Sequence, residues 1–132
     1  MKALIQRVSH AQVKVDDNIV GEIGEGLLVL LGVERDDTRL KTEKLLDKVL
    51  QYRVFSDAEG KMNRSAQDID GGLLLVSQFT LAADTNKGLR PSFSSAATPE
   101  LARELYDHGA TYLHNKHTSV ATGIFAADMK IQ

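Results

Sequence analysis

The sequence predicts an α+β fold in a single domain spanning residues 1–132, and three observations lead to this prediction. Apolar and polar residues alternate through much of the first third of the chain, as is typical of antiparallel strands with one buried face. The run GLLVLLGV, residues 26–33, is apolar on both faces and indicates a central strand covered on both sides. Two later stretches repeat apolar residues three and four positions apart and predict amphipathic helices.

The first strands are expected within residues 2–15, where Leu4, Gln6 and Val8 share one face. Residues 16–18, Asp-Asp-Asn, form the predicted turn into a short strand with glycines at positions 21, 24 and 26. The apolar run 26–33 then supplies the central strand. Because this strand is apolar on both faces, a helix or a second sheet must pack against it.

The first helix is predicted to begin at an N-cap of Asp36 or Asp37 and to run to about Tyr52. Its apolar residues recur at helical spacing while its lysines face outward. The stretch YRVFSD, residues 52–57, predicts a return to strand structure. Residues 58–65 read as a turn and a short irregular piece.

The next predicted strand is GGLLLVSQFTL, residues 71–81. Residues 82–97 show no regular period, and such long loops in compact domains are commonly functional or mobile. The second helix opens with Thr98 as N-cap and Pro99 at its first position. Gly109 interrupts this helix at a cost of about 1 kcal/mol relative to alanine. The tail of the chain predicts a final strand.

The charge balance argues against a general affinity for polyanions. Sixteen Lys and Arg residues stand against eighteen Asp and Glu residues, which gives a formal net charge of −2. Any contact with nucleic acid must therefore be local. Two basic groups, 53–64 and 87–90, form a patch only if the fold brings them together, and scattered solvated charge is the favoured interpretation.

Several classes of site are excluded or disfavoured by composition. The chain has no cysteine, so disulfides, thiol nucleophiles and thiolate metal sites are absent. No apolar run approaches the roughly 20 residues of a membrane span. Arg7 and His10 stand where a signal peptide requires an apolar stretch, so a cytoplasmic location is expected.

The residues alone identify no cofactor or metal site. His114 and His117 lie three apart on a predicted helix, but no third ligand accompanies them, so an exposed helix end is the better interpretation. Ser77 lacks both a Gly-x-Ser-x-Gly motif and an activating histidine, which favours a structural hydroxyl over a nucleophile. Thr80 stands where the strand ends and either bonds the neighbouring loop or faces a ligand.

Seven segments carry a resemblance to a known family. They are SQFTLAAD, RPSF, LIQRV, GLLVLLGV, YRVFSD, GKMN and TGIFAADM. Together, and in register from Met1 to about Gln132, they make the whole chain closely resemble the D-aminoacyl-tRNA deacylase family. The resemblance implies a homodimeric, mostly antiparallel fold with a barrel-like core and two principal helices. It also implies a cytoplasmic enzyme that needs no cofactor and hydrolyses the ester joining a D-amino acid to tRNA.

The resemblance also implies roles for particular residues. Four catalytic residues are expected at the strand end, and six others are expected to bind substrate. The catalytic set is Ser77, Gln78, Phe79 and Thr80; the binding set is Arg7, Met129, Arg90, Pro91, Ser92 and Phe93. Backbone N–H groups near Phe79 and Thr80 are expected to stabilise negative charge on the ester carbonyl oxygen. The substrate's own ribose 2′-OH assists in place of a protein nucleophile.

The sequence departs from the family pattern at one motif. The family carries an Asn-x-Gly-Pro-x-x-Thr segment after the region matched by FAADMKIQ, and this sequence ends before it. That segment reaches the partner's pocket and excludes L-amino acids, so weaker chirality discrimination and a weaker dimer are expected. Gly109 also replaces a bulky apolar residue of the family.

Three functional hypotheses follow from the sequence. The first is a D-aminoacyl-tRNA deacylase. The second is a module that binds tRNA or an aminoacyl-adenosine end without turnover. The third is a general esterase that uses Ser77 as its nucleophile. Hydrolysis of D- and L-aminoacyl-tRNA, and the effect of replacing Ser77, distinguish these alternatives.

Overall fold

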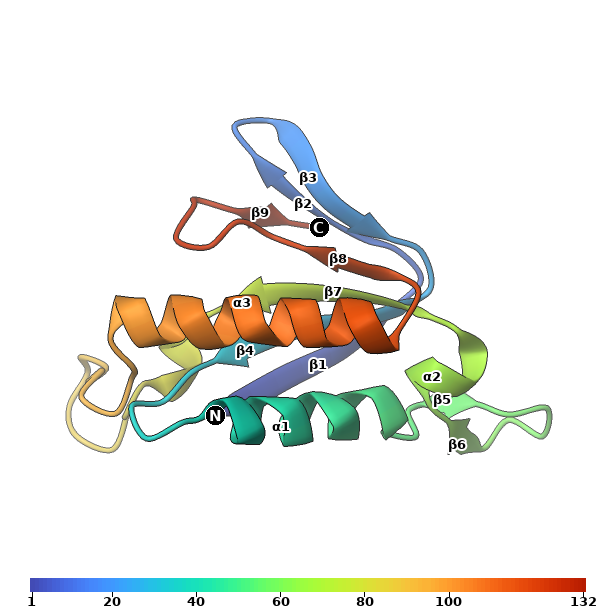
Figure 1. The fold of residues 1–132 in the computed structure, drawn as a ribbon, viewed down its shortest axis with the longest axis horizontal. Helices are drawn as coiled ribbons and strands as arrows, with labels where there is room; N and C mark the ends of the chain where they lie inside the picture. Colours follow the sequence, from blue (N-terminus) through green and yellow to red (C-terminus); the bar gives the residue numbers. More distant parts are fainter.

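A computed structural model describes all 132 residues and arranges them in three layers (Figure 1). The strands are β1 (Lys2–Val8), β2 (Ala11–Val15), β3 (Asn18–Ile23), β4 (Gly26–Gly32), β5 (Phe55–Ser56), β6 (Met62–Arg64), β7 (Gly72–Ser77), β8 (Val120–Thr122) and β9 (Lys130–Ile131). The helices are α1 (Arg39–Gln51), α2 (Ala66–Ile69), the 3₁₀ helix η1 (Phe79–Ala82) and α3 (Pro99–Lys116).

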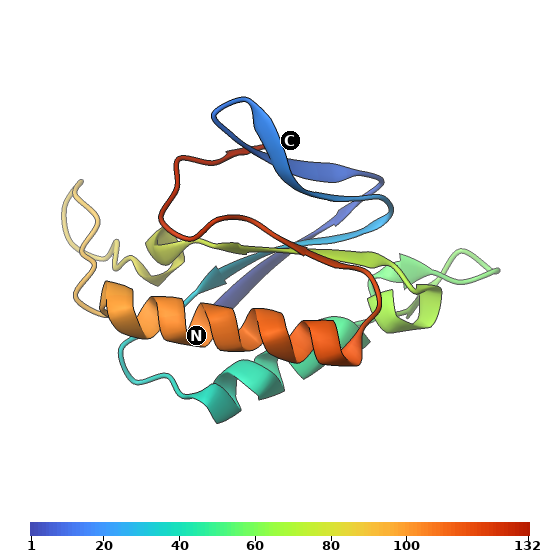
Figure 2. The same cartoon turned by 45° about the horizontal axis from the view of Figure 1, so that its top comes forward.

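The middle layer is a four-stranded sheet with the order β1-β4-β7-β8. Helices α1 and α3 cover one of its faces, and a three-stranded sheet with the order β3-β2-β9 covers the other (Figure 2). The predicted α+β class, the single domain and the two principal helices are therefore confirmed. The sheets do not close into a barrel, because β1 and β8 remain as the two edges of the middle sheet.

The central strand prediction is confirmed, since β4 lies between β1 and β7. Strand β1 runs antiparallel to β4, but β7 runs parallel to both β4 and β8. This parallel pairing was not predicted from the sequence. It requires a long crossover between β4 and β7, which α1, the β5-β6 hairpin and α2 provide.

Strand β7 is apolar on both faces because both are covered. Leu73 and Leu75 lie in the core cluster that includes residues of α1 and α3. Leu74 and Val76 lie in a second cluster with residues of β2 and β3. All four side chains are fully buried, and each contributes about 1.5 to 3 kcal/mol through removal of apolar surface from water.

Helix α1 is capped by Thr38, whose Oγ1 accepts a hydrogen bond from the N–H of Lys41. The predicted cap at Asp36 or Asp37 was wrong, because the Asp37 carboxylate is occupied elsewhere. It accepts the N–H of Glu34 at 2.7 Å and lies 2.9 Å from the Met1 amine. Burial opposes the charge on that amine, but the carboxylates of Glu34 and Asp37 outweigh burial and raise its pKa.

Helix α3 begins at Pro99 with Thr98 as its N-cap, as predicted. Gly109 does not interrupt the helix, which continues to Lys116. A Cβ at position 109 would lie only 3.0 Å from Leu46 Cδ1 and 3.2 Å from Thr42 Cγ2. The glycine therefore allows close contact between α3 and α1, which explains why a bulky side chain is absent there.

Tyr106 ties α3 to the middle sheet, because its hydroxyl donates to the Leu75 carbonyl at 2.7 Å. Replacing Tyr106 with phenylalanine should lower the free energy of unfolding by about 1 kcal/mol at neutral pH. The loss is modest because the Gly123 N–H also donates to the same carbonyl, at 3.1 Å.

The same residue gives a pH dependence. Burial, aided by the charge of Asp107, raises the pKa of Tyr106 from 10.0 to about 12. The folded protein keeps a proton that the unfolded chain releases, so the stabilisation is complete below pH 10 and is lost as pH rises toward 12. When the pH is raised from 10 toward 12, denaturant unfolding should show a smaller loss of unfolding free energy in the phenylalanine variant than in the wild-type protein. Equal losses of unfolding free energy in both proteins would contradict the raised pKa of Tyr106.

Candidate functional site

Strand β7 ends earlier than the sequence predicts. The last N–H in the ladder is that of Gln78, which donates to the Leu31 carbonyl at 2.8 Å. The chain then turns into η1, so the prediction of a strand through residue 81 was wrong for its last part. Gly32 permits this turn, because a Cβ at that position would lie 2.7 Å from the Cβ of Leu81.

The turn leaves two backbone N–H groups without an intrahelical partner. Leu81 is the first residue whose N–H bonds within η1, to the Gln78 carbonyl at 3.3 Å. The N–H groups of Phe79 and Thr80 precede it, and no side chain caps the start of the turn. Gln78 itself has an extended backbone, with φ of −140° and ψ of 90°. The strand end therefore presents two adjacent donors.

A pocket of about 570 Å³ adjoins this turn. It lies where the parallel strands β4 and β7 reach their carboxyl ends, a common place for ligand sites in sheets with parallel strands. The first turns of α3 and the segment before β9 complete its walls. The lining residues are Val33, Ser77, Gln78, Phe79, Ala97, Pro99, Ala102, Phe125, Ala126, Ala127, Asp128, Met129 and Ile131.

Four of the ten expected site residues line this pocket: Ser77, Gln78, Phe79 and Met129. Thr80 is exposed and does not line it. The Thr80 hydroxyl instead accepts a hydrogen bond of 2.5 Å from the side-chain amide of Gln78. The Thr80 hydroxyl thus contacts a pocket residue and orients the side-chain amide of Gln78.

The loop segment 90–93 does not line the pocket, although it lies beside it. The Phe93 ring packs against the Phe79 ring, with centroids 5.2 Å apart and planes inclined at 59°. Two backbone hydrogen bonds between Asp84 and Ser92, at 2.7 and 2.9 Å, close the base of the loop. Arg90, Pro91 and Ser92 are exposed.

Arg7 lies away from the pocket. Its position opposite Leu27 in β4 is level with Leu73 of β7, about 13 Å along the strand from Ser77. Arg7, expected to bind substrate, is not brought to the pocket of its own chain, because β4 separates β1 from β7. Its guanidinium donates to the Val54 carbonyl at 2.6 Å instead.

Phe125 is a pocket residue that the sequence reasoning did not identify. Its ring packs against Tyr106, with centroids 6.0 Å apart, and the Arg103 guanidinium lies 4.8 Å from its centre. Ala102 and Asp128 were also missed. No periodicity or motif separates these residues from ordinary core or loop positions. Phe125 and Asp128 lie in the segment TGIFAADM, which carries part of the family resemblance, but Ala102 lies in no such segment.

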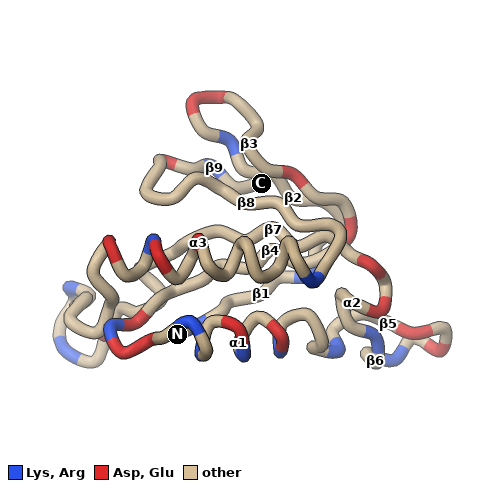
Figure 3. Tube along the Cα trace, viewed as in Figure 1, with Lys and Arg blue, Asp and Glu red and all other residues tan.

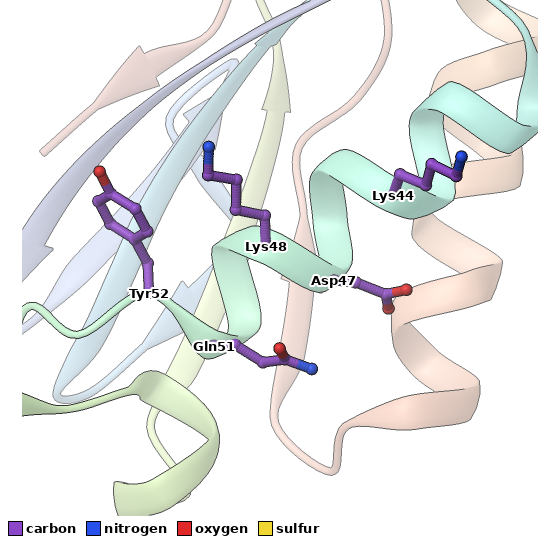
Figure 4. Close-up of a pocket in the computed structure, with 5 residues that line it drawn as sticks. All are labelled: Lys44, Asp47, Lys48, Gln51 and Tyr52. Atoms are coloured by element: carbon purple, nitrogen blue, oxygen red, sulfur yellow. The ribbon is translucent and has the colours of Figure 1, made fainter.

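A second hollow of about 450 Å³ lies on the outer side of α1 and is lined by Lys44, Asp47, Lys48, Gln51 and Tyr52 (Figure 4). Asp47 accepts hydrogen bonds from Tyr112 at 2.8 Å and from Lys116 at 3.0 Å. Burial would raise the pKa of Asp47, but these two donors outweigh burial and lower it. The cluster joins α1 to α3 and is adequately explained as a structural contact.

The basic groups at residues 53–64 and 87–90 lie at opposite ends of the molecule (Figure 3). The fold therefore does not unite them into one patch. His117 is buried and bonds the Gly71 carbonyl through Nε2, whereas His114 is exposed on the last turn of α3. No three histidine or carboxylate side chains converge as a metal site would require. None of the helices is both long and apolar enough to cross a bilayer.

The fold and the pocket together define a class: a small α+β domain with a mainly apolar cavity at the ends of two parallel strands, beside two backbone N–H groups that have no intrahelical partner. Comparison of the sequence with family models identifies the family within this class. Residues 4–132 match the family model described as D-Tyr-tRNA(Tyr) deacylase, and the chain belongs to this family.

Individual relatives agree with this membership. The chain is 63% identical to the D-aminoacyl-tRNA deacylase of Histophilus somni (strain 2336) over 131 residues. It is 59% identical to that of Cellvibrio japonicus (strain Ueda107) over the same length. Each alignment covers 99% of this chain and 90% of the relative.

Solved structures share the fold. A structure named c-Myc DNA Unwinding Element Binding Protein superposes with a TM-score of 0.95 at 36% identity, covering 100% of this chain and 90% of that one. A structure titled as a probable eukaryotic D-amino acid tRNA deacylase superposes with a TM-score of 0.86 at 14% identity, covering 98% and 91%. The second likeness concerns the fold alone.

Proposed function

We propose that this protein hydrolyses the ester bond of D-aminoacyl-tRNA and releases a free D-amino acid and tRNA. Family membership supports the reaction class, and relatives about 60% identical carry the name D-aminoacyl-tRNA deacylase. The single observation that carries the chemistry is the turn after β7, which leaves two backbone N–H groups without an intrahelical partner beside a pocket.

The proposed reaction needs no protein nucleophile. Water attacks the ester carbonyl carbon, the bond to the ribose oxygen breaks, and that oxygen takes up a proton. The N–H groups of Phe79 and Thr80 donate to the carbonyl oxygen as negative charge develops on it. One such donor contributes about 2.7 to 4 kcal/mol to lowering the barrier. The neighbouring ribose 2′-OH of the substrate assists, since it is held next to the ester.

The remaining site residues receive roles consistent with their positions. Ser77, Gln78 and Met129 line the cavity and contact the aminoacyl-adenosine end. The paired rings of Phe79 and Phe93 form an apolar rim for the terminal base. Residues 90–92 extend from this rim as an exposed loop that contacts the adjoining nucleotides.

The proposal includes a homodimer in the cytoplasm, where charged tRNA is used in translation. Two observations support association: Leu4 on the edge strand β1 is 55% exposed, and Ile19 on the edge strand β3 is 51% exposed. Analytical ultracentrifugation should give twice the mass of one chain. A single species with the monomer mass would contradict the dimer.

The experiment that tests the function compares D-Tyr-tRNA with L-Tyr-tRNA as substrates. Release of free D-tyrosine above the buffer rate, with slower release of L-tyrosine, is the expected result. No cleavage of either ester would overturn the enzyme assignment, and retained binding of a non-hydrolysable analogue would then indicate a binding module.

Replacing Ser77 with alanine should leave most of the activity, with kcat reduced by less than about tenfold. The reason is that no histidine lines the pocket to activate the Ser77 hydroxyl. Rates measured with saturating D-Tyr-tRNA provide the check. Loss of activity to the buffer level, with an unchanged melting temperature, would instead support the general esterase with a serine nucleophile.

A further inference from the structure

Arg103 is an exposed cation on α3 that the proposed reaction does not use. It takes part in none of the ion pairs of the protein. Its own helix offers two carboxylates at spacings where side chains meet, Glu100 three residues before it and Asp107 four residues after it. The Arg103 guanidinium instead lies 4.8 Å from the centre of the Phe125 ring. Its charge is therefore not neutralised by a carboxylate.

The guanidinium of Arg103 lies at the edge of the pocket beside η1. Pro99 and Ala102 of α3 line this pocket. Arg103 lies four residues after Pro99 and next to Ala102, so it continues the same face of the helix. Phe125, which holds the guanidinium, also lines the pocket. The Arg103 side chain is not part of the lining, so its charge lies beside the cavity and not inside it.

The ring that holds Arg103 is itself anchored. Phe125 packs against Tyr106, with ring centroids 6.0 Å apart, and the Tyr106 hydroxyl donates to the Leu75 carbonyl of β7 at 2.7 Å. An aromatic ring attracts a guanidinium without accepting a conventional hydrogen bond, so the N–H donors of Arg103 stay available to a ligand. The fixed ring also reduces the entropy that the long side chain loses when it binds.

We infer that Arg103 binds the phosphate that joins the terminal adenosine of tRNA to the preceding nucleotide. Arg103 thereby favours esters carried on RNA over the same ester carried on a nucleoside. This inference rests on the proposed function. A guanidinium presents a planar fork of N–H groups that matches two oxygens of one phosphate, which an exposed lysine cannot do.

The shape of the substrate supports this assignment. The ribose of the terminal adenosine carries three groups that diverge: the ester on C3′, the base on C1′ and the phosphate on C5′. The proposed reaction assigns the ester to the N–H groups of Phe79 and Thr80, and the base to the rim formed by Phe79 and Phe93. The wall left for the phosphate is that of α3 and Phe125, where the free guanidinium lies.

The kinetic test uses two small substrates that differ only in the phosphate. They are the 3′-D-tyrosyl ester of adenosine and the same ester of adenosine 5′-methylphosphate, which imitates the diester of RNA. At low salt, the wild-type kcat/KM should be about three- to tenfold higher for the phosphate-bearing ester. The preference should shrink in about 0.5 M NaCl, because salt screens exposed charges. Equal kcat/KM for both esters at low salt would overturn the inference.

Variants assign the preference to Arg103. Arg103→Gln should abolish it, and Arg103→Lys should restore it in part, because lysine keeps the charge without the fork. The ratio of the two kcat/KM values is the readout, since a displaced Phe125 ring would slow both substrates alike. Arg53→Gln removes an equal exposed charge near the opposite end of the molecule and should leave the ratio unchanged (Figure 3). An undiminished ratio in Arg103→Gln would overturn the inference.

A binding measurement separates this inference from the proposed reaction. The probes are D-tyrosyl adenosine linked through a 3′-amide, its 5′-methylphosphate and its 5′-monophosphate, none of which requires turnover. Tighter calorimetric binding of the methylphosphate than of the nucleoside, by about three- to tenfold and dependent on Arg103, supports the inference even if the chain hydrolyses no ester. Tighter binding of the monophosphate alone would indicate a site for free nucleotides and overturn it. Equal binding of all three probes contradicts it even if hydrolysis occurs.

Discussion

Replacing Phe79 with proline is expected to lower kcat for D-Tyr-tRNA about 100- to 1000-fold relative to the alanine variant at the same position. Proline has no N–H, so this change deletes one of the two donors at the start of η1. The backbone accepts it, because proline is favoured at the first position of a helix and the preceding Gln78 is extended.

The alanine variant is the matched control. Phe79→Ala removes the ring and its contact with Phe93 but keeps the backbone N–H. It should mainly raise KM, whereas the proline variant should additionally lower kcat. Single-turnover rates at saturating substrate separate the two effects, and thermal unfolding confirms that both variants fold. Equal kcat in the two variants would show that the Phe79 N–H does not stabilise the transition state.

Replacing Gly26 with alanine should destabilise the protein by more than about 3 kcal/mol and leave little folded material at 37 °C. A Cβ at this position would lie 1.9 Å from the carbonyl oxygen of Gly72 and 2.6 Å from its nitrogen. Both atoms belong to the backbone of β7, and that nitrogen also donates to the Glu25 carbonyl at 2.9 Å. Relief of the clash therefore requires separation of the parallel strands.

Gly24 supplies a control two residues earlier. A Cβ there would meet no atom within 4 Å, and its φ is not in the left-handed region. Gly24→Ala should leave stability unchanged or raise it by up to about 1 kcal/mol through a less flexible unfolded chain. Urea unfolding of both variants provides the comparison. Similar stability of Gly26→Ala and Gly24→Ala would contradict the close strand approach.

The elements that the sequence predicts well are those whose signal is local. The uninterrupted apolar run 26–33 correctly indicated a strand covered on both faces, and the Thr98-Pro99 pair correctly marked the start of α3. The cap of α1 was misassigned because Thr38 and its two acidic neighbours are equally good candidates locally. The Asp37 carboxylate is instead engaged by the Glu34 N–H and by the distant Met1 amine.

The site residues likewise differ in whether their positions could be predicted from local sequence. Ser77, Gln78 and Phe79 stand at a visible break in an apolar strand, and the pocket includes all three. Asp128 has no comparable signal, because its place in the pocket depends on a turn and on packing between segments remote in sequence. The distance between Arg7 and the pocket of its own chain could not be predicted, because alternation along a strand reveals its faces but not which strand lies beside it.

The strand order of the middle sheet, β1-β4-β7-β8, follows the order of synthesis. Each strand that emerges from the ribosome can therefore add to the free side of the one before it, without insertion between strands already paired. Growth of this kind avoids rearrangement of early pairings during translation. The β2-β3 ribbon gains its partner later, since β9 is made after all four strands of the middle sheet.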